Sequence, residues 1–164
     1  MTDLIPAIRN AARALIIHDD KILLLRKQGG VRGERYALPG GAQDPGESLI
    51  DTLKRECLEE IDTTVTVGNL VHIADFYKTK DTDPPVRQHL VEFLFVCSIA
   101  EDYSPRNGPR PDKHQVEVVW TELNQLTQLP LYPQYLSDHI LDYQDNDRDL
   151  YLGTFHDQKA SQDD

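Results

Sequence analysis

Three glutamates within five positions are the part of this chain best suited to metal chemistry. Glu56, Glu59 and Glu60 stand in the stretch "RECLEEID", directly after Arg55. Like charges four residues apart on a helix repel by roughly 0.2–0.5 kcal/mol per pair, and clustered carboxylates raise one another's pKa unless cations intervene. Mg²⁺ suits such a cluster, because it prefers oxygen ligands and bridges carboxylates to phosphates.

The helix that must carry these glutamates has a recognisable start and one apolar face. In "DPGE", Asp44 is predicted as the N-cap and Glu47 as its capping-box partner. On a helical wheel the glutamates form a stripe about 100° wide beside the apolar face. We therefore predict a helix from Pro45 to Ile61 whose acidic stripe borders a cleft. Its apolar positions are Leu49, Ile50, Leu53, Cys57 and Ile61.

Strand patterns stand on both sides of this helix. "AARALIIH" and "KILLLRK" predict a hairpin joined by "DD", and "YALPGG" leads towards the helix. Later strands are predicted for "TTVTV", "LVHIADFY", "HLVEFLFVCSIA" and "QVEVVW", followed by helices for "TELNQL" and "PQYLSDHILDY". In the acidic tail, about 142–164, "LYLGTF" can dock as a short strand. This order predicts a single domain over 1–164, a mixed sheet with helices on its faces.

Charge and composition exclude several classes of function. The chain has 164 residues and a formal net charge of −11, which disfavours nucleic acid and anionic membranes as partners. No apolar run approaches the ~20 residues of a membrane span, and we expect no secretory signal. Cys57 and Cys97 have no Cys-x-x-Cys spacing, as expected of reduced thiols in a cytoplasmic protein. Between Lys21 and Arg35, five basic residues against one acid indicate an anion site.

The spacing of the acidic residues matches a known family. Gly41, Glu47, Arg55–Glu56 and Glu59–Glu60 are separated by five, seven and two residues, and this pattern resembles the box of the Nudix hydrolase superfamily (MutT-like). "ILLLR", "YALPGG" and "EVVW" resemble the family's flanking segments. The resemblance implies an α+β Nudix fold, an α/β/α sandwich with a mixed central β-sheet and a loop-helix-loop box.

The end of the box departs from the family pattern. Asp62 and Thr63 stand where the family has a glycine and an aliphatic residue. Glycine suits a left-handed helix terminus, and aspartate is among the few residues that tolerate that conformation. We therefore predict a left-handed or otherwise non-helical residue at Asp62.

The resemblance also implies roles for individual residues. It implies hydrolysis of a nucleoside diphosphate linked to another moiety, with Mg²⁺ or Mn²⁺ as cofactor. Glu59, Glu60 and the carbonyl of Gly40 would ligate the metal. Glu56 would ligate it too, or act as general base on the attacking water. Arg55 would orient a glutamate through a charge-assisted hydrogen bond, and Arg26 would hold a substrate phosphate.

Other candidate side chains each have a structural alternative. Glu47 matches the box as an additional carboxylate, but the capping box explains it equally well. Glu117 and Glu92 are candidates for a late metal-binding carboxylate, or are ordinary strand residues. Tyr36, before the Gly-Gly turn, would line the pocket, and Arg35 would attract an anionic substrate at its rim.

Several alternatives for function stay open. The substrate is a nucleoside triphosphate, a sugar nucleotide or a dinucleoside polyphosphate, and the loops 78–88 and 101–114 are expected to form the specificity walls. Non-catalytic nucleotide-sensing modules tend to lack box glutamates, whereas this chain has all of them, which argues against that alternative. An isomerase on the same fold would need further catalytic Cys and Glu residues. A homodimer is compatible with the resemblance, because dimers are common among relatives.

Overall fold

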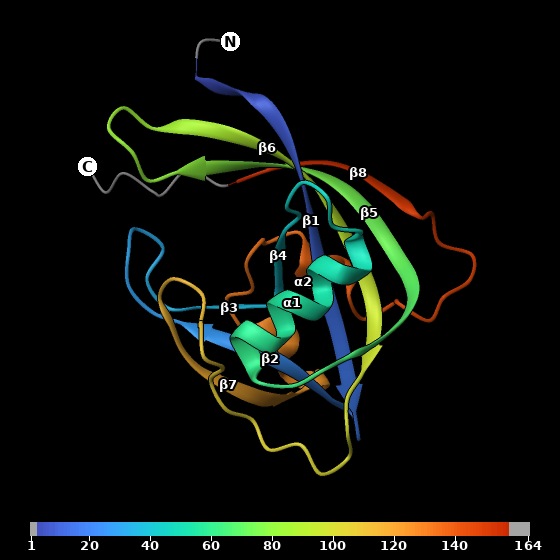
Figure 1. The fold of residues 1–164 in the computed structure, drawn as a ribbon. Helices are drawn as coiled ribbons and strands as arrows, with labels where there is room; N and C mark the ends of the chain where they lie inside the picture. Colours follow the sequence, from blue (N-terminus) through green and yellow to red (C-terminus); the bar gives the residue numbers. More distant parts are fainter. Residues whose placement is uncertain (1–2, 158–164) are drawn as a thin grey trace.

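A mixed sheet of eight strands organises the computed structural model, which describes residues 3–157 (Figure 1). The strands run in the order β3-β2-β1-β6-β5-β8, with β4 paired to β1 and β7 paired to β2. β1 runs parallel to β6, whereas β5 and β6 are antiparallel, so the predicted mixed sheet is confirmed. The strands are β1 (Leu4–His18), β2 (Lys21–Lys27), β3 (Arg35–Ala37), β4 (Gly40–Ala42), β5 (Thr66–Lys80), β6 (Val86–Ser98), β7 (Gln115–Glu122) and β8 (Tyr151–His156).

Helical segments cover both faces of the sheet. α1 (Leu49–Ile61) packs its apolar side on one face, and η1 (Leu123–Gln128) with α2 (Leu136–His139) covers the other. The second half of β1 is buried from both sides, since Ala12, Ala14 and Ile16 face α1 and Leu15 faces the opposite core. This explains the nearly continuous apolar run of that strand. The side chains that join α1 to the sheet are Leu53, Cys57, Ile61, Ala12, Ala14, Ile16, Leu23 and Leu25.

β1 also joins two wings of the sheet. It pairs with β6 from Leu4 to Ile16, and its last residues Ile17 and His18 pair with β2. In Figure 1, α1 lies in front of β1 and β4, between the wing of β5 and β6 and the wing of β2 and β7. α1, which carries the glutamates, therefore lies where the two wings meet. No helix within residues 3–157 has the length and apolar character needed to cross a membrane.

Several element boundaries differ from those predicted. α1 begins at Leu49 rather than at Pro45. The last two residues of "TTVTV" and all of "LVHIADFY" lie in one strand, β5, with register shifts that mark bulges. "TELNQL" begins a 3₁₀ helix, and "PQYLSDHILDY" contains only the four-residue α2. "LYLGTF" does form a strand, β8, parallel to β5, and the last part of the acidic tail, 158–164, lies outside the described residues.

Candidate active site

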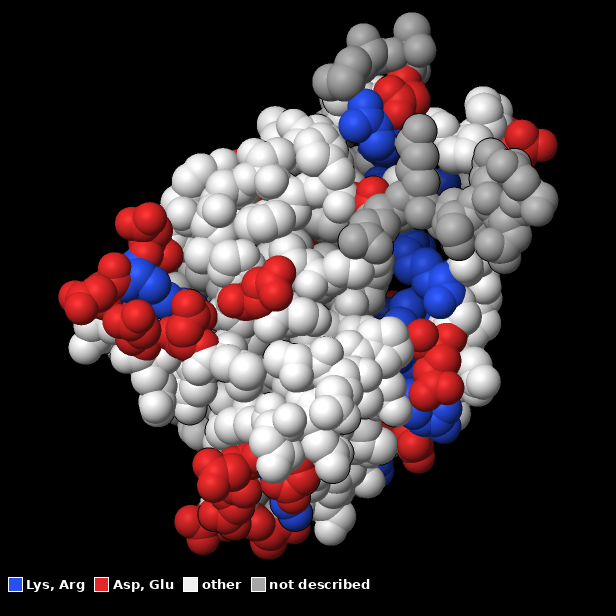
Figure 2. Space-filling view, turned by 180° about the vertical axis from the view of Figure 1, so that it is seen from behind, with Lys and Arg blue, Asp and Glu red and all other residues white. Residues whose placement is uncertain are grey.

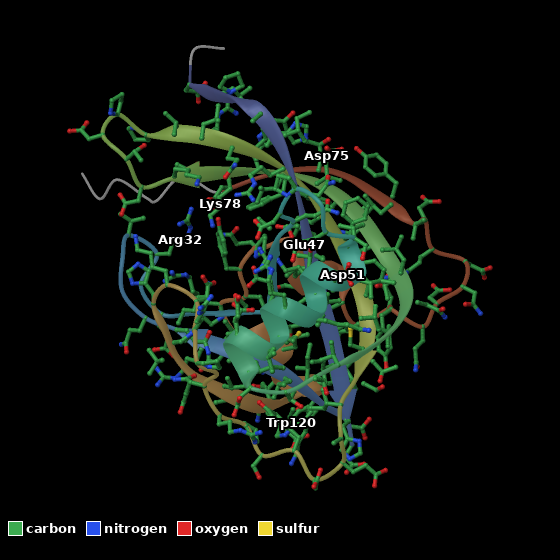
Figure 3. All side chains as sticks on the ribbon, viewed as in Figure 1. Arg32, Glu47, Asp51, Asp75, Lys78 and Trp120 are labelled. Atoms are coloured by element: carbon green, nitrogen blue, oxygen red, sulfur yellow. The ribbon has the colours of Figure 1, made fainter. Side chains whose placement is uncertain are left out.

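The start of α1 uses a different capping box from the one predicted. Ser48 is the N-cap, its side chain accepts a hydrogen bond from the Asp51 amide at 3.1 Å, and the Asp51 carboxylate reaches back to the Ser48 amide. Glu47 does accept from the Asp44 amide at 3.0 Å, but in a turn that precedes the helix. Figure 3 labels Glu47 and Asp51 at this end of α1. The Glu47 carboxylate therefore lies just before the helix, where Arg55 donates to both of its oxygens.

The end of α1 confirms the prediction for Asp62. Asp62 has φ 58° and ψ 39°, a left-handed conformation. Its carboxylate accepts from Nε of Arg106 at 2.7 Å. Further groups of the segment 101–115 hold the last helical carbonyls, because the amides of Gly108 and Arg110 donate to Glu60 and Glu59 at 3.0 and 2.9 Å. An aspartate in place of glycine is thus stabilised from outside the helix.

Arg55 is the cation that makes the acidic crowding tolerable. Its guanidinium donates to both carboxylate oxygens of Glu47, at 2.7 and 3.0 Å, and to Glu56 at 3.0 Å and Glu59 at 3.4 Å. It also donates to the carbonyl of Ala42 at 3.2 Å. The Arg55 hydrogen bond lowers the pKa of Glu47 to about 2. Arg55 thus fixes three box carboxylates relative to the loop before the helix.

Glu60 is the box glutamate in the most confined position. Its side chain is buried, Oε1 accepts from the Gly40 amide at 2.8 Å, and Oε2 has no hydrogen-bond partner. Burial raises the pKa of Glu60 to about 8, helped by the nearby charges of Asp112 and Glu56. Burial also raises the pKa of Glu56. The site therefore holds more carboxyl groups than its own donors keep ionised.

The two glycines before the helix bring backbone close to these carboxylates. A Cβ on Gly41 would lie 2.6 Å from the Glu56 carboxylate, so a side chain there would displace Glu56. Gly40 has φ +134°, and a Cβ there would lie 2.0 Å from the carbonyl oxygen of Ala12. The Gly40 carbonyl, predicted to bind metal, accepts from Arg13 Nη1 at 2.8 Å.

Arg13 and Asp112 are site residues that the sequence did not single out. Arg13 also donates to Glu92 at 3.1 Å, and both side chains are largely buried. Asp112 forms an ion pair with Lys27 and lies close enough to raise the pKa of Glu60. Arg13 had a usable signal, since it is a charge within the otherwise small and apolar run "AARALII". Asp112 stands in a proline-rich loop, where no feature of the sequence distinguishes it as a site residue.

The remaining predicted substrate residues have partners other than the box glutamates in the described part of the chain. Arg26 pairs across the sheet with Tyr36 on one side and Glu117 on the other, and it donates to Glu117 at 2.8 Å. Arg35 is buried and donates to the carbonyls of Gly29 and Gly33 at 2.9 and 2.7 Å. In this structure, Arg26 is engaged by Glu117 and Arg35 organises the loop between β2 and β3.

The donor set suits a hard cation. Among residues 3–157, no three His, Cys, Asp or Glu side chains already lie close enough together to hold a metal ion. The partnerless Glu60 oxygen is nevertheless a carboxylate aimed into a confined site, with Glu56 beside it. Carboxylate oxygens are the ligands that Mg²⁺ and Mn²⁺ prefer. The chemistry of these residues therefore fits a divalent cation.

Comparisons with known proteins identify the family. The NUDIX domain model matches residues 8–141. An uncharacterized Nudix hydrolase, YvcI, from Bacillus subtilis (strain 168) is 29% identical over 149 residues, covering 90% of this chain and 86% of that protein. An ADP-ribose pyrophosphatase from Methanocaldococcus jannaschii is 31% identical over 94 residues, covering 57% of this chain and 52% of that protein.

A solved structure shares the fold. A NUDIX hydrolase from Nitrosomonas europaea superposes with a TM-score of 0.65 at 22% identity, covering 84% of this chain and 89% of that one. The fold, the box spacing and the match over residues 8–141 agree with one another. This chain belongs to the NUDIX domain family and is an enzyme of the Nudix pyrophosphohydrolase type.

Proposed function

We propose that this enzyme hydrolyses a pyrophosphate bond in a nucleoside diphosphate linked to another moiety, with Mg²⁺ or Mn²⁺ as cofactor. The observation that carries the proposal is the buried Glu60 carboxylate, which has one oxygen on the Gly40 amide and the other without a partner. A buried carboxyl group without a partner favours its protonated form, as the raised pKa of Glu60 expresses, and a divalent cation at that oxygen would favour the ionised form instead.

The site residues divide the work between binding and proton transfer. Glu60, Glu56 and Glu59 would hold the metal, with Asp112 as a further carboxylate near Glu60. A bound cation would neutralise phosphate charge and lower the pKa of its water. Glu56, whose pKa burial raises, is suited to accept a proton from the attacking water if it is not itself a ligand. Arg55 keeps Glu56 and Glu59 in place.

The substrate class follows from this chemistry and from the relatives. Metal ions held by carboxylates promote hydrolysis of phosphoanhydrides. The cation neutralises the negative charge of the phosphates, which would otherwise repel the attacking nucleophile. The relative from Methanocaldococcus jannaschii is named an ADP-ribose pyrophosphatase, so nucleoside diphosphate derivatives are the first compounds to test. All box glutamates are present, which favours turnover over a sensing module that only binds nucleotide.

The test is a substrate panel with matched variants. Nucleoside triphosphates, sugar nucleotides, dinucleoside polyphosphates and ADP-ribose are incubated with Mg²⁺, and phosphate is measured after coupling to a phosphatase. We expect turnover of at least one class, a loss of about 10²–10⁴-fold in Glu60→Gln, and no change in Glu101→Gln, which alters an exposed glutamate. Nucleotide binding with no turnover of any compound would instead support the sensing module.

A further inference from the structure

Four cationic side chains gather where the two wings of the sheet approach each other. They come from β1, β2, the β2–β3 loop and β5, and they are Arg13, Lys27, Arg32 and Lys78. Burial and, after it, the charges of the other three cations together lower the pKa of Lys78 to about 8. In Figure 3 the labelled Lys78 and Arg32 side chains lie near each other, although they come from opposite wings. Figure 2 shows basic side chains gathered along one edge of the molecule, interleaved with acidic ones.

Three of these four cations have an acidic partner. Arg13 pairs with Glu92 at 3.1 Å, Lys27 pairs with Asp112, and Arg32 pairs with Asp157 at 2.5 Å. Within residues 3–157, Lys78 has neither a hydrogen bond nor an ion pair for its ammonium group, and its recorded contact is the Tyr132 ring, 6.0 Å from Nζ. The uncompensated positive charge of the group is therefore on Lys78.

The Lys78 ammonium group remains open to a ligand. The fully enclosed polar atoms without a partner in the described chain belong to Glu60, His72 and Glu92, not to Lys78. Gln88 stands directly opposite Lys78 in the β5–β6 register and is only 9% exposed. Its side-chain amide also makes no hydrogen bond within residues 3–157. An ammonium and an amide, both unsatisfied, thus lie side by side on one face of the sheet.

Contacts through Arg13 connect this pair to the box glutamates. Arg13 donates to the carbonyl of Gly40 at 2.8 Å, and the amide of Gly40 donates to Glu60 at 2.8 Å. The charge of Arg13 lowers the pKa of both Glu60 and Lys78, and the charge of Asp112 raises the pKa of both. Arg13 therefore links the glutamate site to the group of cations that includes Lys78.

We propose that Lys78, assisted by Gln88, binds a phosphoryl group of the substrate that lies beyond the phosphates held at the box glutamates. The assignment of this group to a substrate rests on the proposed function. A lysine ammonium binds phosphate as a point charge through charge-assisted hydrogen bonds. Substrates with three or more consecutive phosphates would use this contact, whereas those with two would reach only the glutamates.

The test measures binding of inorganic tripolyphosphate and pyrophosphate by calorimetry in Mg²⁺. Lys78→Met keeps the apolar stem and removes the charge, and Lys54→Ala is the control, an exposed lysine of α1 outside the expected specificity loops. We expect Lys78→Met to weaken tripolyphosphate binding by about 10- to 100-fold and pyrophosphate binding less than threefold. Lys78→Arg should restore most of the affinity, and Lys54→Ala should match the wild type.

Separate results would overturn this inference and the proposed function. Wild-type protein that does not bind tripolyphosphate, or Lys78→Met that binds it as tightly as wild type, overturns the inference. If that happens while nucleotides are still hydrolysed, the proposed function stands. Conversely, Lys78-dependent tripolyphosphate binding without hydrolysis of any panel compound supports the anion site and contradicts the proposed function. Unchanged thermal melting of Lys78→Met checks that the variant is folded.

Discussion

Arg55 serves three glutamates and one backbone carbonyl with a single guanidinium group. In Arg55→Ala the carboxylates keep their mutual repulsion and lose the cation they share. We expect the hydrolysis rate to fall by about 100-fold or more. The free energy of unfolding of the metal-free protein should fall by about 1–3 kcal/mol. Initial rates and urea denaturation, each with and without Mg²⁺, measure the two effects.

The neighbouring lysine supplies the control for this prediction. Lys54→Ala removes an exposed cation from the same helix and should change neither quantity measurably. If Arg55→Ala hydrolysed substrate at the wild-type rate, the idea that Arg55 orients Glu56 and Glu59 would be wrong.

His72 gives a prediction about pH. Its ring is buried, Nδ1 has no partner, and burial lowers its pKa from 6.5 to about 4. Below pH 6.5 the unfolded chain binds a proton that the folded chain does not, so stability is lost as pH falls from about 6.5 to about 4. The full effect is at most roughly 3 kcal/mol.

Urea denaturation at pH 7, 6 and 5 tests the role of His72. We expect His72→Leu to flatten the fall in unfolding free energy over this range, and His18→Leu, at a half-exposed site, to follow the wild type. Equal slopes for wild type and His72→Leu would show that another group causes the acid sensitivity.

The loop 101–114 contacts the last turn of α1, the turn that carries Glu59 and Glu60. A Cβ on Gly108 would lie 2.3 Å from the carbonyl oxygen of Glu59, so Gly108→Ala must push the loop away from the helix end. We expect a loss of about 1–3 kcal/mol in unfolding free energy, because buried helical carbonyls lose their donors. The hydrolysis rate should also fall, since Glu59 and Glu60 stand in that last turn.

The same loop provides the control for this prediction. Ser104→Ala changes an exposed side chain and leaves the backbone contacts of the loop intact. Its unfolding free energy and its hydrolysis rate should both match those of the wild type. A Gly108→Ala variant as stable and active as Ser104→Ala would show that the loop does not position the helix.

Local patterns account for the elements that sequence could predict. α1 and the left-handed Asp62 follow from apolar spacing and residue type. The start of the helix was misplaced because two overlapping capping patterns, Asp44–Glu47 and Ser48–Asp51, both fit, and Arg55 draws Glu47 into the site. The pairs of Arg13 with Glu92 and of Lys27 with Asp112 join residues far apart in the chain, and no local pattern encodes such partners.

Over the whole molecule, the buried carboxylate of Asp157, directly after β8, contacts both wings of the sheet. The side chain of Asp157 is 2% exposed. It accepts from Arg32 in the β2–β3 loop at 2.5 Å, from the Thr79 amide of β5 at 3.1 Å and from the Tyr132 hydroxyl at 2.8 Å. Three segments that are distant in sequence therefore share a single acceptor.

Removing this acceptor should weaken the joint between the wings. In Asp157→Ala the Thr79 amide and the Tyr132 hydroxyl lose their acceptor, and Arg32 keeps the carbonyl of Thr79 but loses its carboxylate. We therefore expect the unfolding free energy to fall by about 2–4 kcal/mol. Hydrogen exchange of β8 and of the β2–β3 loop should rise together. Asp149→Ala removes an exposed acid and should leave both measurements unchanged. If only β8 exchanged faster in Asp157→Ala, Asp157 would hold β8 in place without connecting the two wings.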